Sequence, residues 1–215
     1  KCKSKDHVLK LGNRKDKGYK YYVGVDPAIS TDGDYNVITV LEVDDEMNKT
    51  IVHVDRAKNV EFRENIEKIR LIGKIFQPEE ILYETNTFAK AFTQELRNIS
   101  DLNVRDFHTT RKKKQEIILN LQMNIENQKI RFPYGDNASR RLTGSLIEEL
   151  SMFAITSSGK FEGVGAHDDL VMSLALANAA SQNPNDVFLM LDDMGIFEDP
   201  KPVNNSIGGM LGLNF

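Results

Sequence analysis

Two adjacent aspartates stand directly before an apolar, alanine-rich run late in the sequence. The stretch GVGAHDDLVMSLALANAA covers residues 163–180, and Asp168 and Asp169 precede its apolar part. Neighbouring carboxylates repel each other, so a helix that begins here needs a reason to carry both. The positive end of the helix dipole would ease both charges, and adjacent helical residues diverge by roughly 100°. The two aspartates can therefore do different jobs, one binding a cation while the other holds a second cation or a water.

Two further acids end predicted strands elsewhere in the chain. Asp26 closes KYYVGVD (20–26), and Glu84 closes EEILYE (79–84). If these strands are parallel neighbours, both carboxylates emerge at one edge of the sheet, where ligands bind in open α/β sheets. The helix that starts near residue 167 can bring a third acid to the same edge. Such a cluster is reasonable only where cations neutralise it.

The chemistry of such a cluster is that of a hard divalent cation. Ligands that are all oxygen favour Mg²⁺ or Mn²⁺ over zinc, and two such ions about 4 Å apart can activate water and stabilise the leaving oxygen in phosphodiester cleavage. Simpler roles stay open for each acid alone. An aspartate at a helix start is often a cap, an aspartate before proline is common in turns, and Glu84 could lie on the surface. His167 is either a ligand or an ordinary loop histidine.

The pattern of apolar residues predicts the elements that position these acids. Three strands at 20–26, 36–43 and 50–57 form an antiparallel meander, and later strands are expected at 79–84, 103–108 and, as a short edge strand, 128–133. Helices are expected at 61–76, 86–99, 111–127, 138–150 and 167–181, with a β-hairpin around SSG (157–159). A meander followed by βα units predicts an α/β fold: a mixed sheet of antiparallel and parallel strands with helices on both faces.

Length and composition fit one sizeable domain with flanking segments. The chain has 215 residues, 40% of them hydrophobic, and a net charge of −4, which argues against a nucleic-acid coat protein but not against a local basic groove. The single Cys2 rules out an internal disulfide, and we expect no membrane span and no signal peptide. The absence of an initiator Met suggests a piece of a longer protein.

We expect three parts in the chain. Residues 1–19 form a basic linker or N-terminal extension, residues 20–182 form the folded domain, and residues 183–215 form an acidic C-terminal tail. The tail is either loosely attached and disordered or a partner segment that folds on binding.

Basic residues offer candidate contacts for an anionic partner. TTRKKKQEII (109–118) places Arg111, Lys112, Lys113 and Lys114 at a predicted helix start, where cations oppose the helix dipole. Phosphate binding by these side chains and by free backbone N–H groups would explain them, and a solvated charge run is the alternative. The weaker candidates are Arg140, Arg141 and Lys160.

Three motifs together resemble a known family. YYVGVDPA, ILYETN and above all GAHDDLVMSLALA are similar to the C-terminal nuclease domain of large terminase subunits of tailed bacteriophages, which has an RNase H-like fold. The resemblance covers residues 20–181 in the same order. It implies that Asp26, Glu84 and Asp169 are the metal-binding and catalytic triad, with Asp168 as an accessory ligand for Mg²⁺ or Mn²⁺, two ions being expected. It also implies an extra β-hairpin, near Lys160, that can guide DNA.

By this resemblance the chain is a metal-dependent endonuclease that cleaves concatemeric viral double-stranded DNA during genome packaging. The full-length protein would act in the host-cell cytoplasm at the procapsid, with the viral portal and the small terminase subunit as partners and no membrane. The ATPase motor is missing, because the chain has no GxxxxGK[ST] motif. Two alternatives remain: a Holliday-junction resolvase or transposase-like nuclease with the same fold, and a non-catalytic portal-docking module.

Overall fold

A computed structural model of the chain describes residues 18–28, 35–85, 94–95, 102–155, 161–163 and 168–182, with the side chains of 153–155 and 161–163 left out. The strands are β1 (Lys20–Asp26), β2 (Tyr35–Val43), β3 (Lys49–Lys58), β4 (Glu80–Thr85), β5 (Val104–His108), β6 (Ile130–Arg131), β7 (Phe153–Ile155) and β8 (Phe161–Gly163). The helices are α1 (Phe62–Phe76), α3 (Arg111–Glu126), α4 (Asn137–Met152) and α5 (Asp169–Ala180).

Six strands form one mixed sheet in the order β5-β4-β1-β2-β3-β6. β1, β2 and β3 pair antiparallel, as the meander predicted, whereas β4 pairs parallel with both β1 and β5. The mixed sheet of antiparallel and parallel strands expected from the sequence is therefore confirmed. β1 and β4 meet the condition set by the sequence, since they are parallel neighbours and the ends of the two acid-bearing strands lie at one edge.

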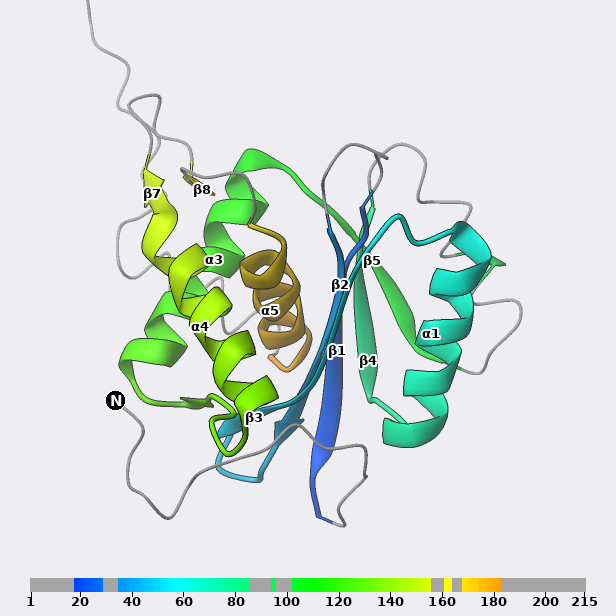
Figure 1. The fold of residues 1–215 in the computed structure, drawn as a ribbon, viewed down its shortest axis with the longest axis horizontal. Coiled ribbons are helices and arrows are strands. Elements are labelled where there is room, and N and C mark those ends of the chain that lie inside the picture. Colours follow the sequence, from blue (N-terminus) through cyan, green and yellow to red (C-terminus); the bar gives the residue numbers. More distant parts are fainter. Residues whose placement is uncertain are drawn as a thin grey trace, which may run out of the picture. The chain divides into compact units, whose positions relative to one another are not determined.

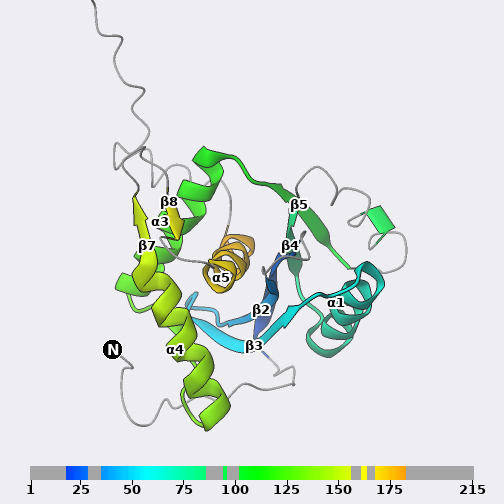
Figure 2. The ribbon, with the colours of Figure 1, turned by 45° about the horizontal axis from the view of Figure 1, so that its top comes forward.

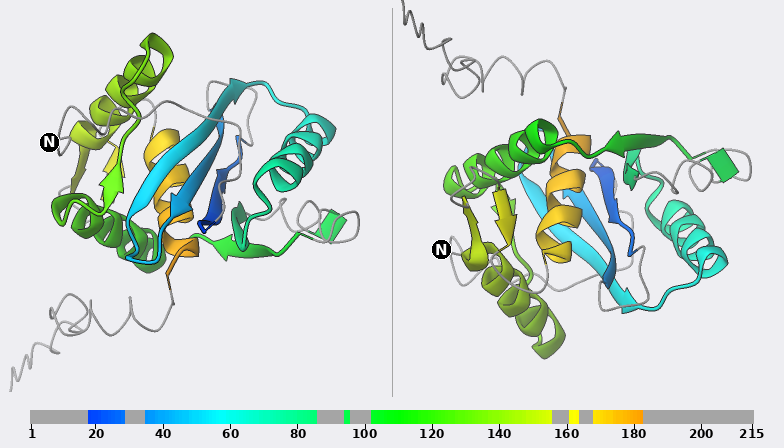
Figure 3. Two further views of the ribbon diagram at one scale, coloured as in Figure 1. Left: turned by 90° about the horizontal axis from the view of Figure 1, so that it is seen from below. Right: turned by 90° about the horizontal axis from the view of Figure 1, so that it is seen from above.

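Helices cover both faces of the sheet. α1 lies on one face and α5 on the other, and α3 and α4 pack outside α5 (Figure 1). Turning the molecule shows the same layers, with α5 between the sheet and the two outer helices (Figures 2 and 3). Side chains alternate along a strand, so Val23 and Val25 of β1 join the core beneath α1. By the same alternation, Gly24 and Asp26 belong to the α5 face.

α5 is buried along nearly its whole length because both the sheet and the outer helices contact it. Its alanines and serine let it approach β1 closely. A Cβ atom on Gly24 would lie 2.1 Å from the Ser173 carbonyl oxygen and 2.3 Å from the Ala177 nitrogen, so only glycine fits. The Ser173 hydroxyl also donates a hydrogen bond to Thr39 of β2. This contact fixes the helix that starts with the two aspartates above the end of β1.

The predicted hairpin is confirmed, because β7 and β8 pair antiparallel from Phe153↔Gly163 to Ile155↔Phe161. β8 packs beside α3 and α4. The residues that join the two strands, Lys160 included, lie outside the described residues.

Some sequence-based expectations differ from the structure or fall outside it. The strand predicted at 128–133 shortens to β6, because only Lys49 and Thr50 of β3 pair with it, in parallel, at Ile130 and Arg131. The helix predicted at 86–99 lies outside the described residues apart from 94–95, as do residues 1–17 and 183–215 of the two flanking segments. In the part of the chain that is described, no helix has the length and apolar character to span a membrane.

Candidate functional site

Asp26 and Glu84 meet at one edge of the sheet. The parallel ladder pairs Val25 with Tyr83, so Asp26 and Glu84 follow as the next residues of neighbouring strands. Both side chains are partly buried and both belong to the α5 face. A hydrogen bond links the two carboxyl groups and favours a proton on Asp26. The structure thus brings these two acids together as the strand pattern suggested.

Asp168 and Asp169 add two more acids from the start of α5. Asp168 is the N-cap residue, but its side chain makes no capping hydrogen bond, so the simple capping role does not apply to it. Its Oδ2 instead accepts a hydrogen bond from Lys114 Nζ at 2.9 Å. Asp169 is buried, and its Oδ2 accepts a bond of 3.3 Å from the backbone N–H of Tyr35. The adjacent aspartates therefore face different neighbours.

The charges of all four acids act on one another at this edge. Burial raises the pKa of Asp26 well above its ordinary value, and the negative charge of Glu84, the hydrogen bond to Glu84, and the charges of Asp169 and Asp168 raise it further. Burial also raises the pKa of Tyr83, and the charge of Asp26 adds to the effect. A carboxyl group at the end of β1 is thus held in a concentration of negative charge that only a cation or a proton can offset.

Glu149 of α4 holds the start of α5 in place. Its Oε2 accepts hydrogen bonds from the backbone N–H groups of Leu170 at 2.9 Å and Val171 at 3.3 Å. Its Oε1 accepts a bond of 2.9 Å from Arg56 Nη2 of β3. Burial raises the pKa of Glu149, Arg56 and the two amide bonds lower it, and the charge of Asp169 raises it again. Glu149 therefore caps α5 in place of Asp168.

Three contacts at the site were not expected from the sequence: Thr109 donating a hydrogen bond to Glu84 Oε1, the Tyr35 amide on Asp169, and Glu149. A signal for Glu149 existed. It follows Leu146 by three residues, on the apolar stripe of its helix, where a carboxylate needs a partner. Thr109 and Tyr35 carry no such signal, because tertiary packing alone brings them to the acids.

The basic run at the start of α3 lies next to this edge, since α3 follows β5 and Lys114 reaches Asp168. Arg111, Lys112 and Lys113 are exposed. One expectation needs correction: the N–H of Lys113 is capped by the Thr110 hydroxyl, so it is not open to an anion as the sequence suggested.

Arg140 and Arg141 lie away from the acids. Arg140 and Arg141 are exposed near the start of α4, about 13 Å along that helix from Glu149. Arg140 hydrogen-bonds backbone oxygens of Tyr134 and Gly135. Lys160 and His167 lie outside the described residues.

The four acids suit a hard divalent cation by their chemistry. All their donors are carboxylate oxygens, and Asp26 sits in negative charge that nothing in its described surroundings fully offsets. Across the described ranges, no three His, Cys, Asp or Glu side chains are arranged as a ready-made metal site. Three of the four acids already accept hydrogen bonds, which would have to rearrange around an ion. Asp168 accepts from Lys114, Glu84 accepts from Thr109, and Asp169 accepts from the Tyr35 amide.

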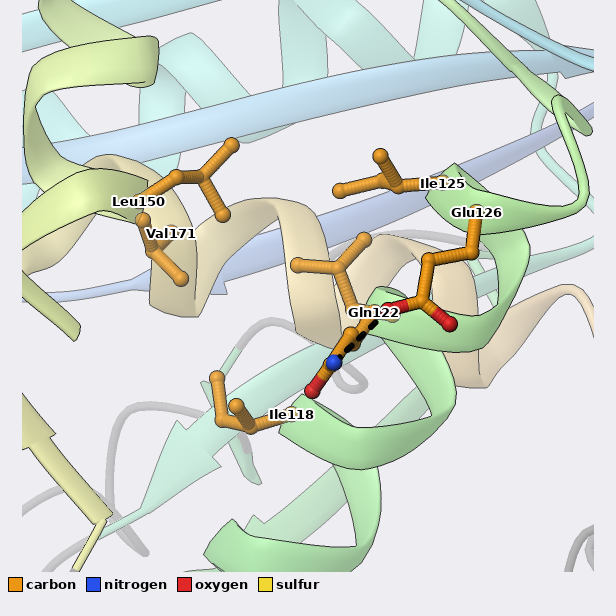
Figure 4. Close-up of a pocket in the computed structure, with 7 residues that line it drawn as sticks. Ile118, Gln122, Ile125, Glu126, Leu150 and Val171 are labelled. Atoms are coloured by element: carbon orange, nitrogen blue, oxygen red, sulfur yellow. Dashed lines mark hydrogen bonds between the residues drawn. The ribbon is translucent and has the colours of Figure 1, made fainter. Parts of the chain in front are cut away.

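A separate apolar hollow of about 370 Å³ lies among α3, α4 and α5 (Figure 4). Its lining includes Ile118, Ile125, Leu150 and Val171, and its polar rim carries the hydrogen bond from Gln122 to Glu126. None of the four clustered acids lines it. This hollow is therefore separate from the acidic cluster at the sheet edge.

Solved structures with a similar fold include several phage terminase nucleases. The large terminase nuclease from thermophilic phage G20c aligns over 81% of this chain and 94% of its own, with a TM-score of 0.63 and 22% identity, and it was also solved with bound magnesium. The nuclease domain of the large terminase g2p from bacteriophage SPP1, with bound Mn, has a TM-score of 0.55 and 10% identity over 81% of this chain and 96% of its own.

The HK97 bacteriophage large terminase has a TM-score of 0.57 and 13% identity, and the alignment covers 81% of this chain but 41% of that one. At these identities the likeness concerns the fold. Among curated proteins, none has a sequence that matches this chain. The model of the terminase RNaseH-like domain matches residues 23–180, a range that includes the acid-bearing end of β1, all of β4 and all of α5. With well over half of its residues matched, the chain belongs to the terminase RNaseH-like domain family.

Proposed function

We propose that this chain is a metal-dependent endonuclease that cuts double-stranded DNA, the nuclease part of a large terminase that cleaves concatemeric viral DNA during packaging. The observation that carries the proposal is the gathering of Asp26, Glu84, Asp168 and Asp169 at one sheet edge, where each of the other three raises the pKa of Asp26. Membership of the terminase RNaseH-like domain family supports it. Related nucleases with bound magnesium or Mn agree with the oxygen-only donor set.

Each acid has a distinct part in this proposal. Asp26, Glu84 and Asp169 are the primary ligands of Mg²⁺ or Mn²⁺, with two ions expected, and Asp168 is the accessory ligand. When bound, such ions supply activation of the attacking water and stabilisation of the leaving oxygen of a phosphodiester. Lys114, which contacts Asp168, would supply a positive charge beside the DNA backbone at this edge.

The exposed run Arg111–Lys113 would hold the DNA backbone next to the cut. Lys and Arg contacts to phosphates fix the position of a duplex without reading its sequence. Sequence-tolerant cutting is what the cleavage of concatemers requires. In the full-length protein we expect the portal and the small terminase subunit as partners, with an ATPase motor on a part of the protein outside this chain.

A plasmid-cutting assay with purified Asp26→Asn tests the proposal. In Mn²⁺ we expect cutting to fall by about 10²-fold or more, because a ligand carboxylate is lost while the shape of the side chain is kept. The control is Asp45→Asn, at an exposed position in the turn between β2 and β3 at the opposite end of the sheet, and it should cut like the unchanged protein. Undiminished cutting by Asp26→Asn would refute the assignment.

The raised pKa of Asp26 predicts how Asp26→Asn changes the stability of the fold. Because the pKa of Asp26 is raised in the folded state, its contribution to stability is present below the ordinary pKa of 3.8 and is lost as pH rises through the raised value. At neutral pH without metal the ionised group therefore destabilises the fold. Asp26→Asn should melt no lower than the unchanged protein in EDTA, so lost cutting will not reflect unfolding.

The same assay separates the rival functions. A junction resolvase would prefer branched over linear duplex in one gel, whereas the proposed nuclease cuts linear DNA. A portal-docking module would neither cut DNA nor bind Mn²⁺ at millimolar concentration in calorimetry.

A further inference from the structure

A second group of cations lies beside the acids, on β2 and β3. Arg56 Cζ is 3.9 Å from the centre of the Tyr35 ring, and Lys58 Nζ is 4.4 Å from the same point. The antiparallel register pairs Tyr35 with Lys58 and Val37 with Arg56, so the three side chains share the α5 face of the sheet. We refer to Tyr35, Arg56 and Lys58 as the Tyr35 cluster.

The Tyr35 cluster is attached directly to the candidate site. The Tyr35 backbone N–H donates to Asp169 Oδ2, and Arg56 donates to Glu149, which caps the helix that carries Asp169. On the other flank, Lys114 of α3 contacts Asp168. The acids therefore lie between two groups of positive charge that come from different parts of the chain.

The charges within the Tyr35 cluster are unequally matched. Arg56 has Glu149 as its ion-pair partner, and the negative face of the Tyr35 ring attracts both cations. Lys58 is exposed, and in the described part of the chain it has the ring contact but no carboxylate within ion-pair distance. Two cations at one ring repel each other, so the arrangement leaves positive charge at Lys58 that suits an anion.

The sheet order sets how far apart the two cationic groups are. β5, which leads into α3, and β3, which carries Lys58, are four steps apart in the sheet, with β4, β1 and β2 between them. At about 4.8 Å between strands this corresponds to about 19 Å, with β1, which carries Asp26, at the middle and β4, which carries Glu84, one strand nearer to β5. β1 is then about 10 Å from β5 and about 10 Å from β3, and each of these distances is about three base pairs along a duplex.

We infer that the Tyr35 cluster binds a backbone phosphate of double-stranded DNA on the opposite side of the cut from Arg111–Lys113. Lys58 makes the contact, the Tyr35 ring orders its side chain, and Arg56 fixes the cluster to the helix that carries the acids. A duplex held at both flanks is placed with a phosphodiester over the acids. This inference rests on the proposed nuclease function and adds a binding subsite to it.

The test compares Lys58→Gln with Lys74→Gln, which changes an exposed lysine in the last turn of α1, on the other face of the sheet. Binding of a fluorescein-labelled random-sequence duplex is followed by fluorescence anisotropy at several salt concentrations, and single-turnover cutting is followed in Mn²⁺. Loss of one phosphate contact should weaken binding by about three- to tenfold for every sequence and lower the salt slope by about one. Single-turnover cutting below saturation should fall by the same factor as binding, and Lys58→Arg should restore both.

The outcomes separate the inference from the function on which it rests. If the unchanged protein binds and cuts duplex DNA but Lys58→Gln behaves like Lys74→Gln, the phosphate contact is wrong and the nuclease proposal stands. That result would leave Lys58 as a cation that only offsets the acids. If the unchanged protein neither binds nor cuts duplex DNA, both proposals fail together. Weaker and less salt-dependent DNA binding by Lys58→Gln, restored by Lys58→Arg, supports the subsite.

Discussion

The two ends of α5 both bury charge or polar groups against the sheet, and they do so in opposite ways. At its start, four carboxylates converge and raise the pKa of Asp26. Near its end, Asn178 donates to Asn120, Asn124 donates to Asn120, and Lys49 Nζ donates to Asn124 at 2.9 Å. Lys49 is 1% exposed, and this chain of amides gives its charge a neutral partner.

The difference supports the proposed ligand site at the start of α5. The lysine end contains a single buried charge whose hydrogen bonds run within the protein, and burial lowers the pKa of Lys49 to about 8, so the protein can relieve the charge by releasing a proton. The acidic end combines several like charges from three elements, and fold stability alone gives no reason to place them together. An excess of like charge at a sheet edge indicates a site that binds a ligand of the opposite charge.

The largest expected effect comes from the helix that carries both ends. Gly24→Ala would place a Cβ against backbone atoms of Ser173 and Ala177, which no rotamer change can relieve. We expect the free energy of unfolding to fall by more than about 4 kcal/mol, measured by urea denaturation, and both ends to be disturbed together. Gly144→Ala in α4 is the control, because nothing lies within 4 Å of its Cβ, and it should gain about 0.5–1 kcal/mol. Equal stability of the two variants would contradict the close helix–strand contact.

The next largest effect is the pH dependence of stability that Lys49, near the end of α5, should cause. The folded-state pKa of Lys49 is about 8 against an ordinary 10.5, so between these values the unfolded chain binds a proton that the folded chain does not. Stability contributed by this group must therefore rise with pH from about 8 to 10.5, by up to about 3 kcal/mol at about 1.4 kcal/mol per pH unit. Denaturation across this range should show the rise in the unchanged protein and in Lys74→Met but not in Lys49→Met. Parallel curves for all three proteins would show that Lys49 is not desolvated as described.

A smaller effect tests how the acidic end is positioned. Glu149→Gln keeps an oxygen for the α5 amides but removes the ion pair with Arg56, so we expect a loss of about 2 kcal/mol in unfolding free energy. If α5 shifts, the aspartates at its start shift as well, and single-turnover cutting in Mn²⁺ should fall about tenfold. The neighbouring Glu148→Gln, at an exposed position, should change neither quantity. Full activity in Glu149→Gln would mean that the α5 start needs no support from α4.

Much of the fold could be predicted because its signals are local. Strands β1 to β3 alternate or run apolar between turn residues, and α1 shows a helical apolar period that ends before Pro78. The start of α5 was predicted from the change to an apolar, alanine-rich run after Asp168 and Asp169. β6 was predicted too long, because its pairing depends on which residues of β3 are left unpaired, and no local pattern in the sequence contains that information.

The residues of the candidate site could likewise be predicted where the signal was local, but their contacts could not. The sequence indicated Asp26, Glu84, Asp168 and Asp169 because each stands at the end of an apolar element, and it indicated Lys114 as part of a basic run. It did not indicate that Lys114 contacts Asp168 or that Glu149 caps α5. It also did not indicate that two cationic side chains lie against the Tyr35 ring. These contacts join residues far apart in the chain, so no spacing rule reveals them.

By itself the sequence determined the elements and the chemistry of their ends, because hydrophobic period and carboxylate oxygens are properties of residues and of their nearest neighbours. Only the tertiary structure decided which ends meet and what stands beside them. The parallel pairing of β1 with β4 and the close contact of α5 with Gly24 convert four separated acids into one concentration of charge. The physical reason is that interactions between charges depend on distance in space, which the chain sets only when its sheet and helices have packed.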